Sequence, residues 1–223
     1  MRRAFAVALA AVAVLATAKN AAAQTDASRV EVSGGVRWIG QLNLADNPAN
    51  EMTLGGGNRA LFESKTTLDD SVGGTATIGV RVSQLFRVEG AVVFSPTQLS
   101  TRVTEDAEGV ADTTITSPVQ QLLVEGGVLV QAAGSRVRPF APFVTAGAGY
   151  LRQLNDGRTL VETGSSYYLG GGLYYARFLS GPRRVKATGL RADVRALFMH
   201  NGVAADSDWR SAPTVTAAFF VRF

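Results

Sequence analysis

The sequence predicts an all-β chain that folds as an eight-stranded antiparallel up-and-down transmembrane β-barrel. After residue 29, apolar and polar residues alternate with a period of two in about eight segments of roughly ten residues each. The connections between these segments are alternately short and long. No stretch after residue 24 reaches 18 consecutive apolar residues, so any crossing of a bilayer would be made by strands, for which ten residues is the usual length.

The composition narrows the possible functions. The chain has 223 residues, of which 18% are charged, with one histidine and no cysteine. The absence of cysteine excludes a disulfide scaffold, a thiolate metal site, a cysteine nucleophile and a lipidated cysteine. Three of the 22 basic residues precede residue 24, so 19 basic residues then face 18 acidic ones, a net charge of +1. Such a balance predicts no nucleic-acid partner.

The first 23 residues are expected to be an export signal. Arg2 and Arg3 precede an apolar run from Ala4 to Ala18, and the small residues Ala21 to Ala23 follow. A basic start, a short apolar run and a small-residue cleavage site are typical of a secretory signal peptide. We therefore expect a signal peptide at 1–23 and one barrel domain at 24–223.

The strands are expected at 30–42, 74–83, 86–95, 120–131, 137–150, 166–178, 189–198 and 214–223. In the first, Val32, Val36 and Trp38 alternate with Glu31 and Arg37. The second to fourth segments and the last three repeat this pattern. The segment 137–150 contains two prolines and several small residues, so its facing stays open.

The connections predict how the barrel is oriented. Long connections are expected at 43–72, 97–117, 151–165 and 199–212, and short ones at 84–85, 132–136 and 179–186. In an even-numbered antiparallel barrel every other connection lies on the same rim, which predicts short periplasmic turns and long extracellular loops. The segment 43–72 is long enough to hold an extra hairpin, which would make ten strands.

Alternation alone does not say which face is outside, and a soluble secreted barrel with an apolar lumen, as in lipocalins, is the alternative. The apolar face carries aromatic residues at both ends. Trp38, Phe94 and Phe198 are expected near the long-loop rim, and Phe86, Tyr175 and Phe223 near the short-turn rim. Phe86 and Phe94 are ~26 Å apart along a strand and roughly 20 Å after tilt, which suits two membrane interfaces. We therefore expect the apolar face to point to lipid.

The polar face would then line the lumen with charges of both signs. The residues expected there are Glu31, Arg37, Arg81, Arg87, Glu89, Glu125, Arg191, Asp193 and Arg195, together with Arg222. Opposite charges in a narrow lumen can pair, and glycines on the same face leave room for the long side chains.

Three segments resemble small outer-membrane barrels of the OmpA and OmpX type. The ending from Ala217 to Phe223 is similar to the terminal strand of such proteins, whose last aromatic residue is read by the barrel-assembly machinery. Residues 138–150 resemble their Arg-Pro-aromatic to Gly-x-Gly-aromatic strand, and 189–195 their penultimate strand with inward charges. The resemblance implies an assembly signal in Phe219, Val221 and Phe223.

The same resemblance implies a monomeric protein of the Gram-negative outer membrane. Its partners would be outer-membrane lipid and lipopolysaccharide, the barrel-assembly machinery and periplasmic chaperones.

The residues predict no enzyme and no cofactor. His200 is the only histidine, and Gly202 stands where lipid A deacylase barrels would have serine, so the catalytic constellation is incomplete. The loop acids Glu105, Asp106 and Glu108 match no calcium loop, and no metal is expected.

The predicted role is structural or in surface interaction, with small porin-like ion conductance as a possible addition. The alternatives are an outer-membrane lipid-modifying enzyme and a soluble lipocalin-like barrel that binds an apolar ligand.

Overall fold

The computed structural model describes residues 29–52, 58–104, 112–131, 140–155, 160–179, 184–202 and 208–223. The expected signal peptide and the loop acids Glu105, Asp106 and Glu108 lie outside these residues. Within them, every regular element is a β-strand, and no helix is long and apolar enough to cross a membrane.

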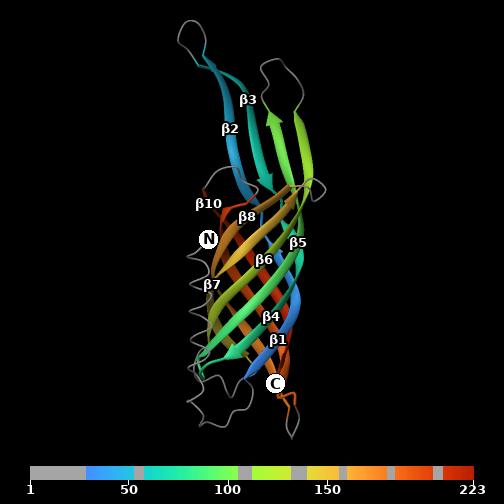
Figure 1. Cartoon of the computed structure of the whole chain (residues 1–223), viewed down its shortest axis with the longest axis vertical. Helices are drawn as coiled ribbons and strands as arrows, with labels where there is room; N and C mark the ends of the chain where they lie inside the picture. The colour runs from blue at the N-terminus through green and yellow to red at the C-terminus, as the bar shows by residue number, and fades with distance from the viewer. Residues whose placement is uncertain are drawn as a thin grey trace.

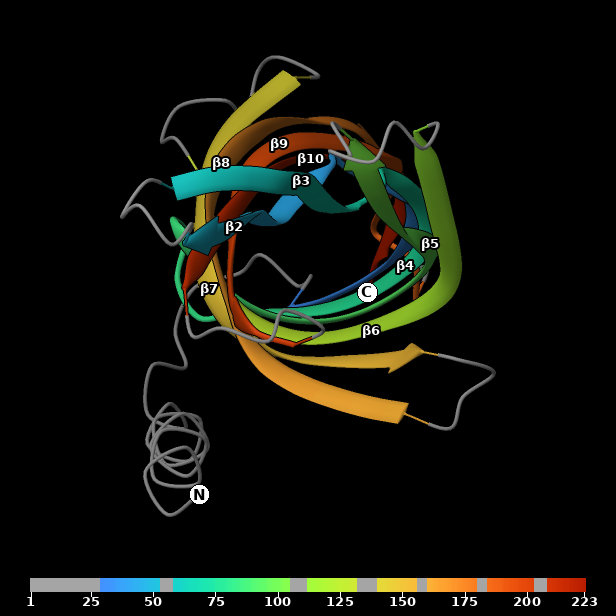
Figure 2. The ribbon, with the colours of Figure 1, turned by 90° about the horizontal axis from the view of Figure 1, so that it is seen from above.

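Eight strands form a closed ring, which confirms the predicted fold class. They are β1 (Val30–Ile39), β4 (Ser71–Arg81), β5 (Phe86–Thr104), β6 (Thr113–Gln131), β7 (Phe140–Asn155), β8 (Leu160–Phe178), β9 (Ala187–Asn201) and β10 (Trp209–Arg222). Each neighbouring pair is antiparallel. The ring closes where β1 pairs with β10, from Glu31↔Arg222 to Ile39↔Thr214, and Figure 2 shows it from above. Closure satisfies the backbone groups that an open edge would leave unpaired.

The segment 43–72 does contain an extra hairpin, but the hairpin does not enter the ring. It consists of β2 (Leu42–Met52) and β3 (Asn58–Leu68). β3 pairs with the upper part of β5, from Glu63↔Thr104 to Leu68↔Leu99, whereas β4 takes the place beside β1. The sheet therefore has ten strands and the ring has eight. Pro48 fits this arrangement because β2 is an edge strand, where a missing N–H is tolerated.

Several predicted strand ends were wrong, above all those of β5 and β6, which are longer than a bilayer requires. Each has 19 residues, and most of the expected loop 97–117 continues the two strands. Similarly, β7 extends to Asn155 and β8 begins at Leu160. The extensions of β5 and β6 are rich in serine and threonine and lose the apolar alternation, although threonine still favours strands. Figure 1 shows the hairpins rising beyond one end of the ring; that end is called the upper rim below.

The opposite, lower rim carries the turn between β4 and β5 and the C-terminus (Figure 1). The turn between β4 and β5 is held by Ser83, whose Oγ accepts hydrogen bonds from the N–H groups of Leu85 (3.3 Å) and Phe86 (3.1 Å). Phe223 N–H donates to the Val30 carbonyl over 2.9 Å and extends the ring closure to this rim.

The strand whose facing the sequence left open is also resolved. In β7, Phe140, Val144 and Tyr150 are exposed on the outside, while Ala141 and Phe143 are buried inside.

Candidate functional site

The outer face of the ring is apolar. Val36, Ile78, Leu169 and Val194, on four different strands, are each 56–62% exposed, and they alternate with buried inward neighbours. A soluble barrel with an apolar lumen would have the opposite arrangement. An exposed apolar surface that runs around a ring is typical of a lipid-facing belt.

The predicted interface aromatics lie at the two ends of this outer face. Phe94 and Phe198 are exposed toward the upper rim, and Phe86, Tyr175 and Phe223 toward the lower one. Trp38 is half-buried, and its Nε1 donates to Asp70 Oδ2 over 3.0 Å. Further exposed aromatic residues, which were not predicted to lie at a membrane interface, are Tyr150, Tyr167 and Trp209 above, and Phe140, Phe178 and Phe219 below.

Charged side chains fill the middle of the lumen and are paired with one another. Arg37 contacts Glu125 at 2.8 Å, and Arg195 lies 3.6 Å from the same carboxylate oxygen. Asp193 lies between two guanidinium groups, 2.5 Å from Arg195 and 3.1 Å from Arg191. All these side chains are at most 6% exposed, so each charge has an opposite charge in place of water.

A second set of ion pairs lies closer to the lower rim. Arg191 reaches Glu89 at 2.8 Å, and Glu31 accepts from Arg87 at 2.7 Å and from Arg222 at 2.6 Å. The structure thus brings together nearly all the charged residues expected in the lumen. Arg81 is half-buried at the lower end of β4.

Tyr174 is the central residue of this set, and the sequence reasoning missed it. Its hydroxyl donates to Glu31 over 2.9 Å and accepts from Arg87 (2.8 Å) and Arg191 (3.2 Å). The side chain is fully buried. The alternation contained the signal, because a residue next to the outward Tyr175 must point inward.

The upper lumen is apolar, which was not predicted. A buried cluster fills it, formed by Ile39, Leu42, Leu68, Val93, Val119, Leu123, Leu151, Tyr168, Leu197, Met199 and Ala212. The signal was present where both faces of a strand are apolar, as in Leu122 to Val124 and Ala196 to Met199. The lumen therefore has an apolar upper layer above an ionic layer.

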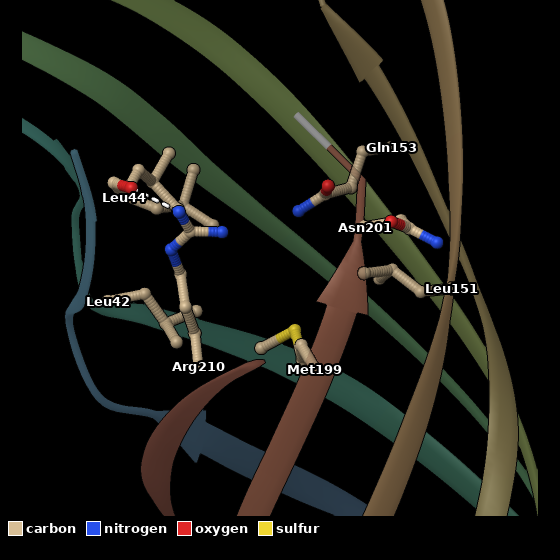
Figure 3. Close-up of a pocket in the computed structure, with 8 residues that line it drawn as sticks. Leu42, Leu44, Leu151, Gln153, Met199, Asn201 and Arg210 are labelled. Carbon is tan, nitrogen blue, oxygen red and sulfur yellow. Dashed lines mark hydrogen bonds between the residues drawn. The ribbon is translucent and has the colours of Figure 1, made fainter. Parts of the chain in front are cut away.

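A small pocket opens at the top of the apolar layer (Figure 3). Leu42, Leu44, Leu68, Leu151 and Met199 form its apolar lining, and Gln153, Asn201 and Arg210 its polar lining. Arg210 Nε donates to the Asn43 carbonyl over 3.0 Å, and its Nη2 donates to the Leu44 carbonyl. Asn201 has a φ of 63°, a left-handed conformation that asparagine tolerates better than most residues.

His200 lies near the end of β9 rather than in the loop that follows it. Its ring stacks on Trp209 with centroids 4.9 Å apart. Among the described residues, no group of three or more histidine, aspartate or glutamate side chains could hold a metal ion.

A closed eight-stranded ring with an apolar outer face and ion pairs in its lumen defines a small β-barrel of the outer-membrane type. Among solved structures, the chain is similar to the outer membrane protein OprG from Pseudomonas aeruginosa, with 13% sequence identity, a TM-score of 0.50, and coverage of 88% of this chain and 96% of that one. Ail, the attachment invasion locus protein of Yersinia pestis, matches with 13% identity and a TM-score of 0.40, covering 88% of this chain and 99% of Ail. At this identity the likeness to OprG shows the fold alone. No protein-family model and no curated protein matches the chain.

Proposed function

We propose that this chain is an integral outer-membrane protein, exported by its N-terminal signal, whose barrel is a closed scaffold for a structural or surface-interaction role. The observation that carries the proposal is the apolar outer face with aromatic side chains at both ends. In water this face would be an aggregation site, whereas in a bilayer it is the surface that lipid solvates.

The lumen supports a scaffold rather than a diffusion pore. An eight-stranded ring leaves an interior that side chains fill. Here the buried ion pairs of Glu125 and Asp193 lie below the apolar layer that contains Leu123 and Leu197. An ion would have to displace paired charges and then cross apolar side chains, so we propose that the closed form does not conduct.

The upper hairpins are the part of the molecule best placed to meet a partner outside the cell. β5 and β6 continue beyond the β6–β7 pairing, which begins at Val119↔Asn155. β2 and β3 also lie beyond the ring. At the other end, Phe219 and Phe223 are exposed and Val221 is half-buried, and we propose that these three residues carry the signal for barrel assembly.

Electrophoretic mobility with and without boiling tests the membrane barrel. The detergent-extracted outer-membrane fraction should contain the chain, and its unboiled form should migrate differently because closed barrels resist SDS until heated. A chain recovered in a soluble fraction without a heat-dependent shift would contradict the proposal and favour the soluble binder.

Planar-bilayer recording tests whether the barrel conducts. The wild-type chain should give no steady conductance, and Asp193→Arg should raise it because the change breaks both pairs of Asp193. A steady conductance of the wild-type chain would overturn the closed scaffold and favour the small porin.

A further inference from the structure

The β2–β3 hairpin is joined to the ring along only one side. β2 pairs with β3 alone among the described strands, and β3 pairs with β5. On the other side, Gly40 N–H donates to the Pro213 carbonyl over 2.8 Å. Above that bond, the Arg210 side chain of β10 donates hydrogen bonds to the carbonyls of Asn43 and Leu44 in β2. The described parts of β2 and β10 therefore lie next to each other without strand pairing, and the Arg210 side chain connects them; this boundary is called the seam below.

The base of this hairpin covers the apolar layer of the lumen. Leu42, at the start of β2, and Leu68, at the end of β3, are 3% and 2% exposed and belong to the same cluster as Leu151 and Met199. Leu44 packs against this cluster. Seen from above, the hairpin extends across part of the opening of the ring (Figure 2).

Beneath this cover, two fully buried side chains each have an oxygen atom without a hydrogen-bond partner among the described residues. Ser95 is 0% exposed and Gln121 is 1% exposed, and neither Ser95 Oγ nor Gln121 Oε1 has a hydrogen-bond partner. They face each other across β5 and β6, and Gln121 pairs with Gln153 of β7 at the edge of the pocket. Buried polar groups without partners are costly, and a ligand or water that binds them recovers that free energy.

We propose that the upper lumen is a binding chamber for a small amphipathic molecule with an apolar body and one hydroxyl group. The body would replace the leucines of the hairpin base against Leu151 and Met199, and the hydroxyl would donate to Gln121 Oε1. The molecule enters through the seam between β2 and β10 when the Arg210 hydrogen bonds open. The ionic layer below ends the chamber, so the molecule is bound there and does not pass through. This inference rests on the proposed function and adds to it the chemical class of the ligand that the outer end of the barrel would bind.

Methyl NMR of the chain in lipid nanodiscs tests the chamber directly. The chain has three methionines, and only Met52 and Met199 follow the expected signal peptide. With 4-butylphenol as the probe, the Met199 methyl signal should shift in a saturable way. Butylbenzene, which has the same body without the hydroxyl, should bind about tenfold more weakly, because a site that contains a buried hydrogen-bonding group disfavours a ligand that leaves it unpaired.

Three variants separate the chamber from simple partition into lipid. Gln121→Leu should abolish the preference for the phenol. Arg210→Ala should speed the exchange of the probe, whereas Arg152→Ala, at an exposed arginine of the same end, should leave it unchanged. Asn43→Cys with Ser211→Cys, joined by a short bis-maleimide across the seam, should block the Met199 shift; the chain has no other cysteine.

The outcomes are read only from samples that show the heat-dependent mobility shift, so that loss of the barrel is recognised separately. A folded barrel whose Met199 signal does not shift, even in Arg210→Ala, overturns the chamber and leaves the membrane barrel intact. A shift that neither Gln121→Leu nor the cross-link alters also overturns it, because such a shift reports probe dissolved in the surrounding lipid.

Discussion

At the scale of single residues, a few buried side chains in the lumen each contact several oppositely charged or hydrogen-bonding partners. Glu125 receives both Arg37 and Arg195, and Tyr174 joins Glu31 to two arginines. The alternation in the sequence places these residues inside. It does not give the pairing, since Arg37 and Glu125 are 88 residues apart and meet only across the closed ring.

Glu125→Gln should destabilise the barrel strongly. The substitution keeps the shape of the side chain but leaves two buried guanidinium groups without their shared carboxylate, which typically costs about 3–5 kcal/mol. Urea unfolding of the chain in lipid vesicles, followed by tryptophan fluorescence, measures the loss. Asp112→Asn is the matched control, because Asp112 and Arg102 are 53% and 62% exposed and an exposed pair contributes about 1 kcal/mol or less. Equal losses in the two variants would show that the lumen pairs do not stabilise the fold.

At the scale of elements, the seam between the first and last strands requires close backbone contact. Gly35 of β1 lies opposite Ala218 of β10. A Cβ at Gly35 would lie 2.1 Å from the Ala217 carbonyl oxygen and 2.5 Å from the Ala218 Cα. Both obstacles belong to the backbone, which cannot yield without separating the two strands.

Gly35→Ala should therefore impair closure of the ring, whereas Gly126→Ala should not. Gly126 is also in mid-strand, but a Cβ there would meet nothing within 4 Å. The fraction of chain that acquires the heat-dependent mobility shift after refolding into detergent measures closure. We expect a several-fold lower yield for Gly35→Ala and a wild-type yield for Gly126→Ala. A normal yield for Gly35→Ala would show that the β1–β10 contact is looser than described.

At the scale of the whole molecule, the outer face and the upper hairpins meet different solvents in the proposed function. Val194, in the middle of β9, is 58% exposed, and Ile115, in the part of β6 beyond the ring, is 62% exposed. Exposure alone does not distinguish them. Their positions along the barrel do, because one would face lipid and the other water.

Val194→Arg should cost about 2–4 kcal/mol of folding free energy in lipid vesicles, the range for arginine at the middle of a bilayer on the lipid face of a barrel. Ile115→Arg should change the stability by less than about 0.5 kcal/mol, as surface substitutions in water usually do. Urea titration of both variants in the same vesicles gives the comparison. Similar values for the two would show that the apolar face does not lie in the bilayer.

The sequence by itself determined the strand period and the eight strands of the ring, whereas the expected long connections 97–117 and 151–165 are mostly strand. The strand features are local, because a period of two fixes which residues share a face of a strand. The apolar upper lumen could have been inferred as well, from stretches such as Leu122 to Val124 in which both faces are apolar.

Only the tertiary structure decided the pairings and the place of the extra hairpin. Whether β2 and β3 enter the ring depends on which strand pairs with β1, and that choice is made between segments distant in the chain. The hydrogen bond from Tyr174 to Glu31 and the hydrogen bond from Arg210 to the Asn43 carbonyl of β2 likewise join residues that are distant in the chain. Closing the ring sets the register of every strand at once, which is why no single segment of the sequence contains these contacts.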